Sequence, residues 1–200
     1  MAVAGRLSCA NAFLHGDHPD KVIDVTAPTP SVAPPPAFRA ASGNHYHTAK
    51  LAAGNRLPIS ADHLAGLSAE CAIKAILLDY LGSQLNQKSR PYSPELMVTP
   101  QPAAPGQKAK KQDQKEYLHE HLPELWGQLS TIANRRKGRE AGPGFMQLLQ
   151  QNPFHDWHVA GRYCDGTTIT EADLARHLQA AYDLIAAHEQ ARILGTGTLA

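Results

Sequence analysis

The sequence has few cysteines and no long apolar run. Its 200 residues include three cysteines, Cys9, Cys71 and Cys164. The odd count and the lack of CxxC spacing argue against a secreted disulfide scaffold and favour reduced thiols. No apolar run approaches the ~20 residues that a membrane span needs. We therefore expect a cytoplasmic protein that does not interact with membranes.

Strong charge and familiar catalytic motifs are also missing. The formal net charge is +1, so the protein as a whole is not expected to be drawn to nucleic acid by its field. There is no phosphate-binding loop, no GxGxxG fingerprint and no nucleophile elbow. Three histidine pairs lack an HExxH pattern or a Cys/His quartet, so we predict neither a metal nor a cofactor. These pairs are His45/His47, His119/His121 and His155/His158.

Proline divides the chain into ordered and loose parts. Five prolines lie between Pro28 and Pro36, and residues 1–43 are predicted to form a flexible Pro-rich leader. A second group of prolines predicts a long loop over residues 83–114, inside the domain. A basic run at the end of this loop is either a solvated surface or a contact for phosphate or RNA. The run consists of Lys108, Lys110, Lys111 and Lys115.

Helical periodicity fills the remaining sequence. Apolar residues at spacings of three and four predict a helix from Ser60 to Leu81, with Ser60 as N-cap and Gly82 as terminator. Its apolar circumference is broad, so we expect it to be the central helix. Further helices are predicted over residues 44–55, 122–139, 145–149 and 170–194, the last opening at Thr170 or at the Thr168-x-x-Glu171 pattern. The fold predicted for residues 44–195 is an all-α, up-and-down bundle of four to five helices.

Glu70 and Lys74 are the polar exception on this central helix. A charge on a buried helix face is costly unless it is paired. We hypothesise that Glu70 pairs with Arg162 inside the bundle, with Tyr163 nearby. The candidate ligand-binding residues are therefore Glu70, Lys74, Arg162 and Tyr163. The alternative is that Glu70 and Lys74 form a simple i,i+4 ion pair with a structural role.

Two segments together resemble the HEPN superfamily of small helical-bundle proteins. The first is ADHLAGLSAECAIKAILLDYL, residues 61–81, preceded by the Tyr-bearing HYHTAKLAA. The second is HLPELWGQL, residues 121–129, which is followed by Trp157 and the pair Arg162-Tyr163. The final segment AAYDLIAAHEQA is similar in position and character to the last helix of that family. The resemblance covers residues 44–194.

The resemblance implies a non-catalytic protein that binds a nucleotide, RNA or a partner protein and forms a homodimer. Family members act in toxin–antitoxin, phage-defence and RNA-processing settings. Nuclease members carry an arginine followed after four to six residues by a histidine, and cleave RNA without metal. Arg39-x5-His45 and Arg56-x6-His63 match this spacing, although neither follows the middle helix. The alternatives are thus a metal-independent endoribonuclease, or an interaction module whose groove holds a peptide or partner helix.

Overall fold

The computed structural model describes residues 34–96 and 118–200. The predicted leader up to residue 33 and the basic run at 108–115 lie outside the described residues. The following description concerns the unit Pro35–Ala200. Among the described residues, no helix is long and apolar enough to cross a bilayer.

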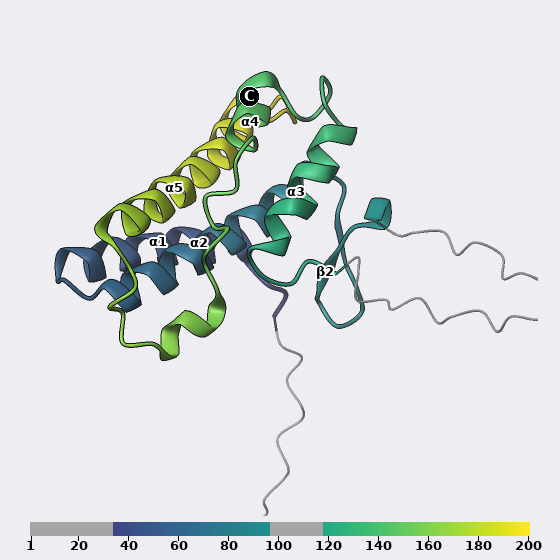
Figure 1. The fold of residues 1–200 in the computed structure, drawn as a ribbon. Coiled ribbons are helices and arrows are strands. Elements are labelled where there is room, and N and C mark those ends of the chain that lie inside the picture. Colours follow the sequence, from purple (N-terminus) through teal and green to yellow (C-terminus); the bar gives the residue numbers. More distant parts are fainter. Residues whose placement is uncertain (1–33, 97–117) are drawn as a thin grey trace, which may run out of the picture. The chain divides into compact units, whose positions relative to one another are not determined.

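The prediction of an all-α bundle is confirmed (Figure 1). The described residues form five α-helices, joined by the 3₁₀ helices η1 (Pro94–Leu96) and η3 (Val159–Tyr163). Within the predicted 83–114 loop, β1 (Gln84–Leu85) and β2 (Pro91–Tyr92) pair as an antiparallel hairpin. These strands are too short for alternation to show in the sequence. The α-helices are α1 (Phe38–Gly54), α2 (Pro58–Asp79), α3 (Glu124–Arg135), α4 (Pro143–Leu148) and α5 (Glu171–Leu194).

Helix α2 is central, as its broad apolar surface predicts. It packs against α1, α3, α5 and η3. Ser42 of α1 donates a hydrogen bond to the carbonyl of Ser68 of α2, and Ser68 donates one back to the carbonyl of Ser42, both at 2.9 Å. Small buried residues on both helices permit this close approach. They include Ala49, Ala52, Ala61, Ala65 and Ala69.

The first two helices begin earlier than their apolar patterns indicate. Helix α1 starts at Phe38 rather than Asn44, so part of the predicted leader is helical. Its first turns are held by contacts with distant residues, which a local pattern cannot show. Helix α2 starts at Pro58, with Leu57 as N-cap, so Ser60 lies in its first turn rather than capping it. Proline suits this position because the first N–H groups of a helix need no intrahelical acceptor.

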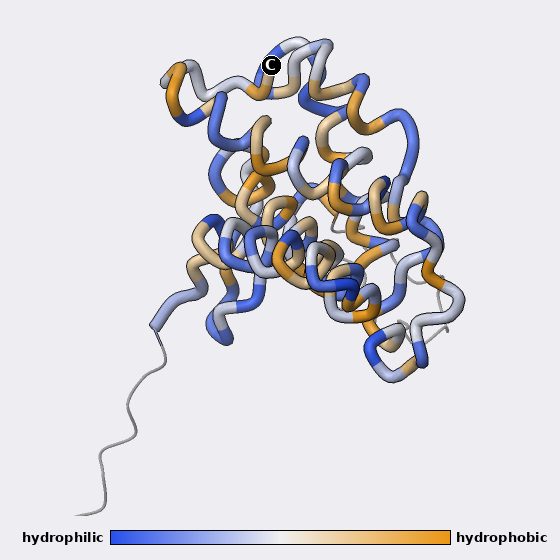
Figure 2. The backbone as a smooth tube through the Cα atoms, turned by 90° about the vertical axis from the view of Figure 1, so that its left-hand side faces the viewer, coloured by the Kyte–Doolittle hydropathy of each residue, from blue (hydrophilic) through white to orange (hydrophobic). Residues whose placement is uncertain are grey.

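The last helix follows its sequence signals closely. Thr170 is the N-cap of α5 and forms a capping box with Asp173, rather than the alternative at Thr168. Gly195 ends the helix in the left-handed conformation at φ 62°. In Figure 2 hydropathy changes within single turns of the helices, as expected for elements that each cover one side of a core. That core includes Ile73 and Ile76 of α2, Leu129 of α3, Phe145 of α4 and Leu184 of α5.

Candidate functional site

A buried histidine of α5 joins three separate parts of the chain. His177 is 3% exposed. Its Nδ1 lies 2.6 Å from Oδ1 of Asp62 on α2, and its Nε2 lies 3.2 Å from Oδ1 of Asp156, in the segment before η3. A carboxylate oxygen accepts hydrogen bonds, so each ring nitrogen is placed to donate one. His177 therefore fastens the segment carrying Asp156 onto α2 and α5.

We call the contacts of His177 with Asp62 and Asp156 the anchor. Neighbouring residues add further contacts to it. Arg176 donates to Asp156 at 2.6 Å. Burial alone would raise the pKa of Asp156, but the hydrogen bonds and charge of Arg176 outweigh it and hold that pKa below its ordinary value. The ring of Phe154 stacks on His177 with centroids 4.9 Å apart. The segment is thus held by charge, hydrogen bonding and ring packing together.

Trp157 follows directly and packs on α2. Its Nε1 donates to the carbonyl of Asp62 at 3.1 Å. The ring occupies the space above Gly66, where an added Cβ would fall 2.0 Å from Cε2 of the indole. The ring of His63 lies parallel to the indole within 13°, at a centroid distance of 6.0 Å. Only glycine at position 66 leaves room for this arrangement.

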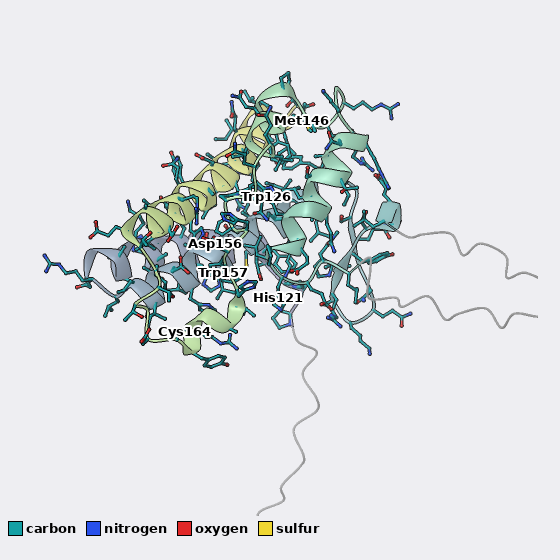
Figure 3. The ribbon with its side chains drawn as sticks, viewed as in Figure 1. His121, Trp126, Met146, Asp156, Trp157 and Cys164 are labelled. Carbon is teal, nitrogen blue, oxygen red and sulfur yellow. The ribbon has the colours of Figure 1, made fainter. Side chains whose placement is uncertain are left out.

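Helix η3 then presents an arginine and a tyrosine to solvent. The Tyr163 side chain is 78% exposed. The guanidinium of Arg162 lies 4.7 Å from the centre of the Tyr163 ring and donates to its hydroxyl at 2.8 Å. We call the half-buried His63 and the exposed Arg162 and Tyr163 the η3 face, and Trp157, which is 2% exposed, is the buried ring against His63. In Figure 3 the segment that bears Arg162 and Tyr163 runs from Asp156 through Trp157 to Cys164.

His63 is the titratable group of the η3 face. Burial is the main cause that lowers its pKa, and the positive charge of Arg162 lowers it further. His45 on α1 adds a smaller lowering, which is opposed by Asp62 and Glu70. The Nδ1 atom of His63 is buried and has no hydrogen-bond partner within the described parts of the chain. A neutral imidazole near a cation can accept a proton while the cation stabilises negative charge.

The hypothesised pair of Glu70 with Arg162 is wrong. The Glu70 carboxylate accepts from the backbone N–H of Leu122 at 3.0 Å and lies 3.1 Å from Nδ1 of His121. Lys74 is 3.9 Å away. Leu122 precedes α3, so its N–H needs an acceptor from outside that helix, and Glu70 supplies one. Arg162 contacts Tyr163 instead.

The candidate ligand-binding residues are therefore divided. Arg162 and Tyr163 lie side by side at the surface, whereas the Glu70 side chain is 4% exposed and that of Lys74 is 12% exposed. Glu70 is positioned to fix the start of α3 on α2.

The two Arg–His pairs that match the nuclease spacing, Arg39 with His45 and Arg56 with His63, have different surroundings. Arg39 forms an exposed ion pair with Glu189 of α5 at 3.1 Å. Arg56 is exposed in the turn between α1 and α2, at φ 57°. The arginine whose charge acts on His63 is Arg162, nearly a hundred residues further along the chain. A search for Arg and His at short spacing cannot find such a pair.

The remaining histidines and cysteines have separate surroundings. The two histidines of the pair His119/His121 have different partners. His119 contacts Ser83 and Gln128, whereas His121 contacts Glu70. Across residues 34–96 and 118–200 no three His, Cys, Asp or Glu side chains are grouped as metal ligands. Burial raises the pKa of the Cys71 thiol to about 11, so it is protonated at neutral pH.

Sequence reasoning missed the anchor of this face, and comparison with known proteins does not supply it. Asp62, Asp156 and His177 belong to no motif, and the one local signal is a histidine within the apolar stripe of α5. No protein-family model, curated protein or solved structure matches the chain. The HEPN resemblance thus stays a prediction, and a function has to be argued from the side chains.

Proposed function

We propose that this protein binds single-stranded RNA or a nucleotide on the η3 face and does not cleave it. The observation that carries the proposal is the exposed Tyr163 ring with Arg162 against it, next to the stacked His63 and Trp157. A base stacked on an aromatic side chain contributes ~1–3 kcal/mol and needs no particular sequence. The Arg162 guanidinium suits a phosphate group.

The anchor behind the η3 face supports the same proposal. Trp157 is fixed by Asp62 and Gly66, and the preceding Asp156 by His177 and Arg176. A surface that is already ordered loses less entropy when a ligand binds. Because the net charge of the protein is only +1, we expect stacking to contribute more than counterion release, and binding to depend weakly on salt.

The test is binding of a fluorescently labelled, unstructured oligoribonucleotide, followed by anisotropy. Tyr163→Ala should weaken binding by about 5- to 150-fold, the equivalent of one lost stacking contact. Tyr182→Ala is the matched control, because Tyr182 is 50% exposed on α5 and packs on Tyr46. Equal affinity of the Tyr163→Ala and Tyr182→Ala proteins would refute the proposal.

A second candidate, metal-independent RNA cleavage, is favoured by the lowered pKa of His63 beside Arg162. His63 would take the proton of a ribose 2′-hydroxyl, and Arg162 would stabilise charge on the phosphate. Incubation of labelled RNA with a chelator separates the two candidates. Cleavage that is lost in His63→Ala supports the second, and intact RNA at every protein concentration supports binding alone. His45→Ala tests the other histidine in the same assay.

The homodimer and the toxin–antitoxin, defence or RNA-processing setting remain predictions from the resemblance, and the cytoplasmic location remains a prediction from the cysteine usage and the lack of a long apolar run. The partner-protein alternative also stays open to test. Light scattering on the purified chain measures the oligomeric state directly. RNA-independent capture of a partner through the η3 face would favour the interaction module over the RNA-binding proposal.

A further inference from the structure

His121 is an exposed histidine that a buried carboxylate holds in place. Its side chain is 57% exposed, whereas that of Glu70 is 4% exposed. The Nδ1 atom of His121 lies 3.1 Å from both carboxylate oxygens of Glu70, so Nδ1–H donates to that carboxylate. The carboxylate is itself fixed, because the backbone N–H of Leu122 donates to it at 3.0 Å and Lys74 lies 3.9 Å away. The fold therefore sets the orientation of an imidazole that faces solvent.

The second ring nitrogen of His121 is left for a ligand. The ring turns its Nδ1 edge toward the buried Glu70, so Nε2 lies on the edge that solvent reaches. Within residues 34–96 and 118–200 no protein group donates a hydrogen bond to this nitrogen. A neutral ring that carries its proton on Nδ1 has a lone pair on Nε2. His121 is thus an accessible hydrogen-bond acceptor whose tautomer is set by Glu70.

The position of His121 continues the η3 face along α2. His63 and Glu70 are seven residues apart, which places both on one side of the helix, about 10 Å apart along its axis. Trp157 lies between them, because its ring covers Gly66. Burial is the main cause that lowers the pKa of His63, and the charge of Glu70 opposes it, so the two side chains are electrostatically coupled. A ligand strand that occupies the η3 face and continues along α2 therefore reaches His121.

The chemistry of His121 selects a hydrogen-bond donor and not a phosphate. Phosphate oxygens accept hydrogen bonds and are negative, so they are repelled by a bare Nε2 with the Glu70 carboxylate behind the ring. Sugar hydroxyls and base amino groups are the neutral donors of a nucleic acid. Stacking on Tyr163 needs no particular sequence, and the donor that every nucleotide of RNA carries is the ribose 2′-hydroxyl. DNA lacks this group.

We propose that His121 accepts a hydrogen bond from a ribose 2′-hydroxyl and makes the protein prefer single-stranded RNA to single-stranded DNA. This inference rests on the proposed RNA binding and names its specificity. Stacking on Tyr163 and the charge of Arg162 are available to both nucleic acids, so neither contact distinguishes them. Glu70 is the positioning residue, because it holds the tautomer in which Nε2 is bare. One neutral hydrogen bond at an exposed site corresponds to a preference of about 3- to 10-fold.

Three unstructured oligonucleotides of one sequence test this preference on the full-length protein: RNA, DNA and 2′-O-methyl RNA. The methylated strand keeps the ribose and its 2′-oxygen but has no hydroxyl proton to donate. Anisotropy titration at pH 8 should give RNA an affinity about 3- to 10-fold higher than that of the other two. His121→Leu should lower the RNA affinity to that of DNA and leave the DNA affinity unchanged. His155→Leu is the matched control that keeps the preference, because the His155 side chain is similarly exposed, at 64%, but does not contact Glu70.

Nitrogen NMR of the histidine rings provides a readout that needs no folded variant. In the wild-type protein RNA should shift the Nε2 resonance of His121, and DNA and the methylated strand should not. The inference is overturned if the wild type binds all three strands equally, if His121→Leu keeps the preference, or if the Nε2 resonance stays in place while RNA binds. These results leave the proposed function intact. Failure of all three strands to bind overturns the proposed function itself, and this inference with it.

Discussion

Two histidines of α5 have nearly equivalent positions but different hydrogen-bond partners. His177 and His188 are each 3% exposed, and they lie about three turns apart on one side of the helix. Each binds an aspartate of α2, at 2.6 Å for Asp62 and 2.8 Å for Asp79. Because both pairs connect the same two helices in the same order, α2 and α5 run parallel.

The difference lies in the second ring nitrogen. At His177 the segment before η3 covers the pair, and Asp156 takes the remaining nitrogen. At His188 none of the described segments does so, and the ring borders a cavity. The same residue types therefore close a core where a third segment covers them, and leave one ring nitrogen without a hydrogen-bond partner where none of the described segments does.

The largest effect that would test this comparison comes from replacing each histidine by leucine. His177→Leu leaves Asp62, whose side chain is 14% exposed, without its partner, and we expect a loss of ~3 kcal/mol in the free energy of unfolding. His188→Leu should cost less than ~1 kcal/mol, because Asp79 is half-exposed and an unused nitrogen disappears. Urea unfolding measures both. Equal losses would show that the two sites are alike.

A glycine substitution tests how tightly the covered end is packed. Gly66→Ala should lower the free energy of unfolding by ~2 kcal/mol, since its Cβ would lie 2.0 Å from the Trp157 ring. Gly127→Ala in α3 is the control, because an added Cβ meets none of the described atoms within 4 Å. It should raise stability by ~1 kcal/mol through helix propensity. The same sign for both would contradict the packing described for Trp157.

Variants of Glu70 test whether this buried carboxylate of α2 also stabilises the fold, as the carboxylates paired with the two histidines do. Glu70→Leu removes the acceptor of the Leu122 N–H and should cost ~1–2 kcal/mol. Glu70→Gln retains one carbonyl oxygen for that N–H and should cost about half as much. Thermal unfolding followed by circular dichroism compares them. Equal behaviour of the two variants would mean that the hydrogen bond to Leu122 contributes little.

The smallest effect concerns His119, a buried histidine with neutral partners. Its ring contacts the Ser83 hydroxyl at 2.9 Å and the Gln128 amide oxygen at 2.7 Å. Burial lowers its pKa below the ordinary 6.5, and the bond to Gln128 offsets this only in part. The unfolded chain thus binds a proton before the folded one does, and stability falls as pH drops below 6.5 toward the folded pKa.

His119→Gln should make this fall in stability shallower between pH 6.5 and its folded pKa. His155→Gln is the control, because the His155 side chain is 64% exposed. Urea unfolding at a series of pH values provides the measurement. A slope that is the same in His119→Gln as in wild type would remove His119 as a source of the pH dependence.

Local patterns predicted much of the fold and little of the site. Periodicity and end signals fix the all-α class, the central helix and the bounds of α5 at Thr170 and Gly195. The start of α1 at Phe38 depends on contacts such as that between Ser42 and Ser68, which lie on different helices. Such contacts leave no trace in a local window.

The candidate site depends on the same kind of long-range contact. Glu70 was recognised as exceptional, but its acceptor role toward Leu122 involves a backbone group that carries no residue signature. The approach of Arg162 to His63 requires the whole segment before η3 to fold across α2. Residue type could nominate these side chains, but their partners could not be read from the sequence pattern.

The reciprocal bonds of Ser42 and Ser68 also bear on how the cavity wall formed by α1, α2 and α5 can move. Sliding α1 along α2 would break both bonds at once, so the wall that α1 contributes behaves as a stationary frame. The exposed ion pair of Arg39 and Glu189 at the same wall is easier to separate. Salt weakens such a pair, so we expect the Arg39–Glu189 contact to loosen with ionic strength while the contact between α1 and α2 at Ser42 and Ser68 holds.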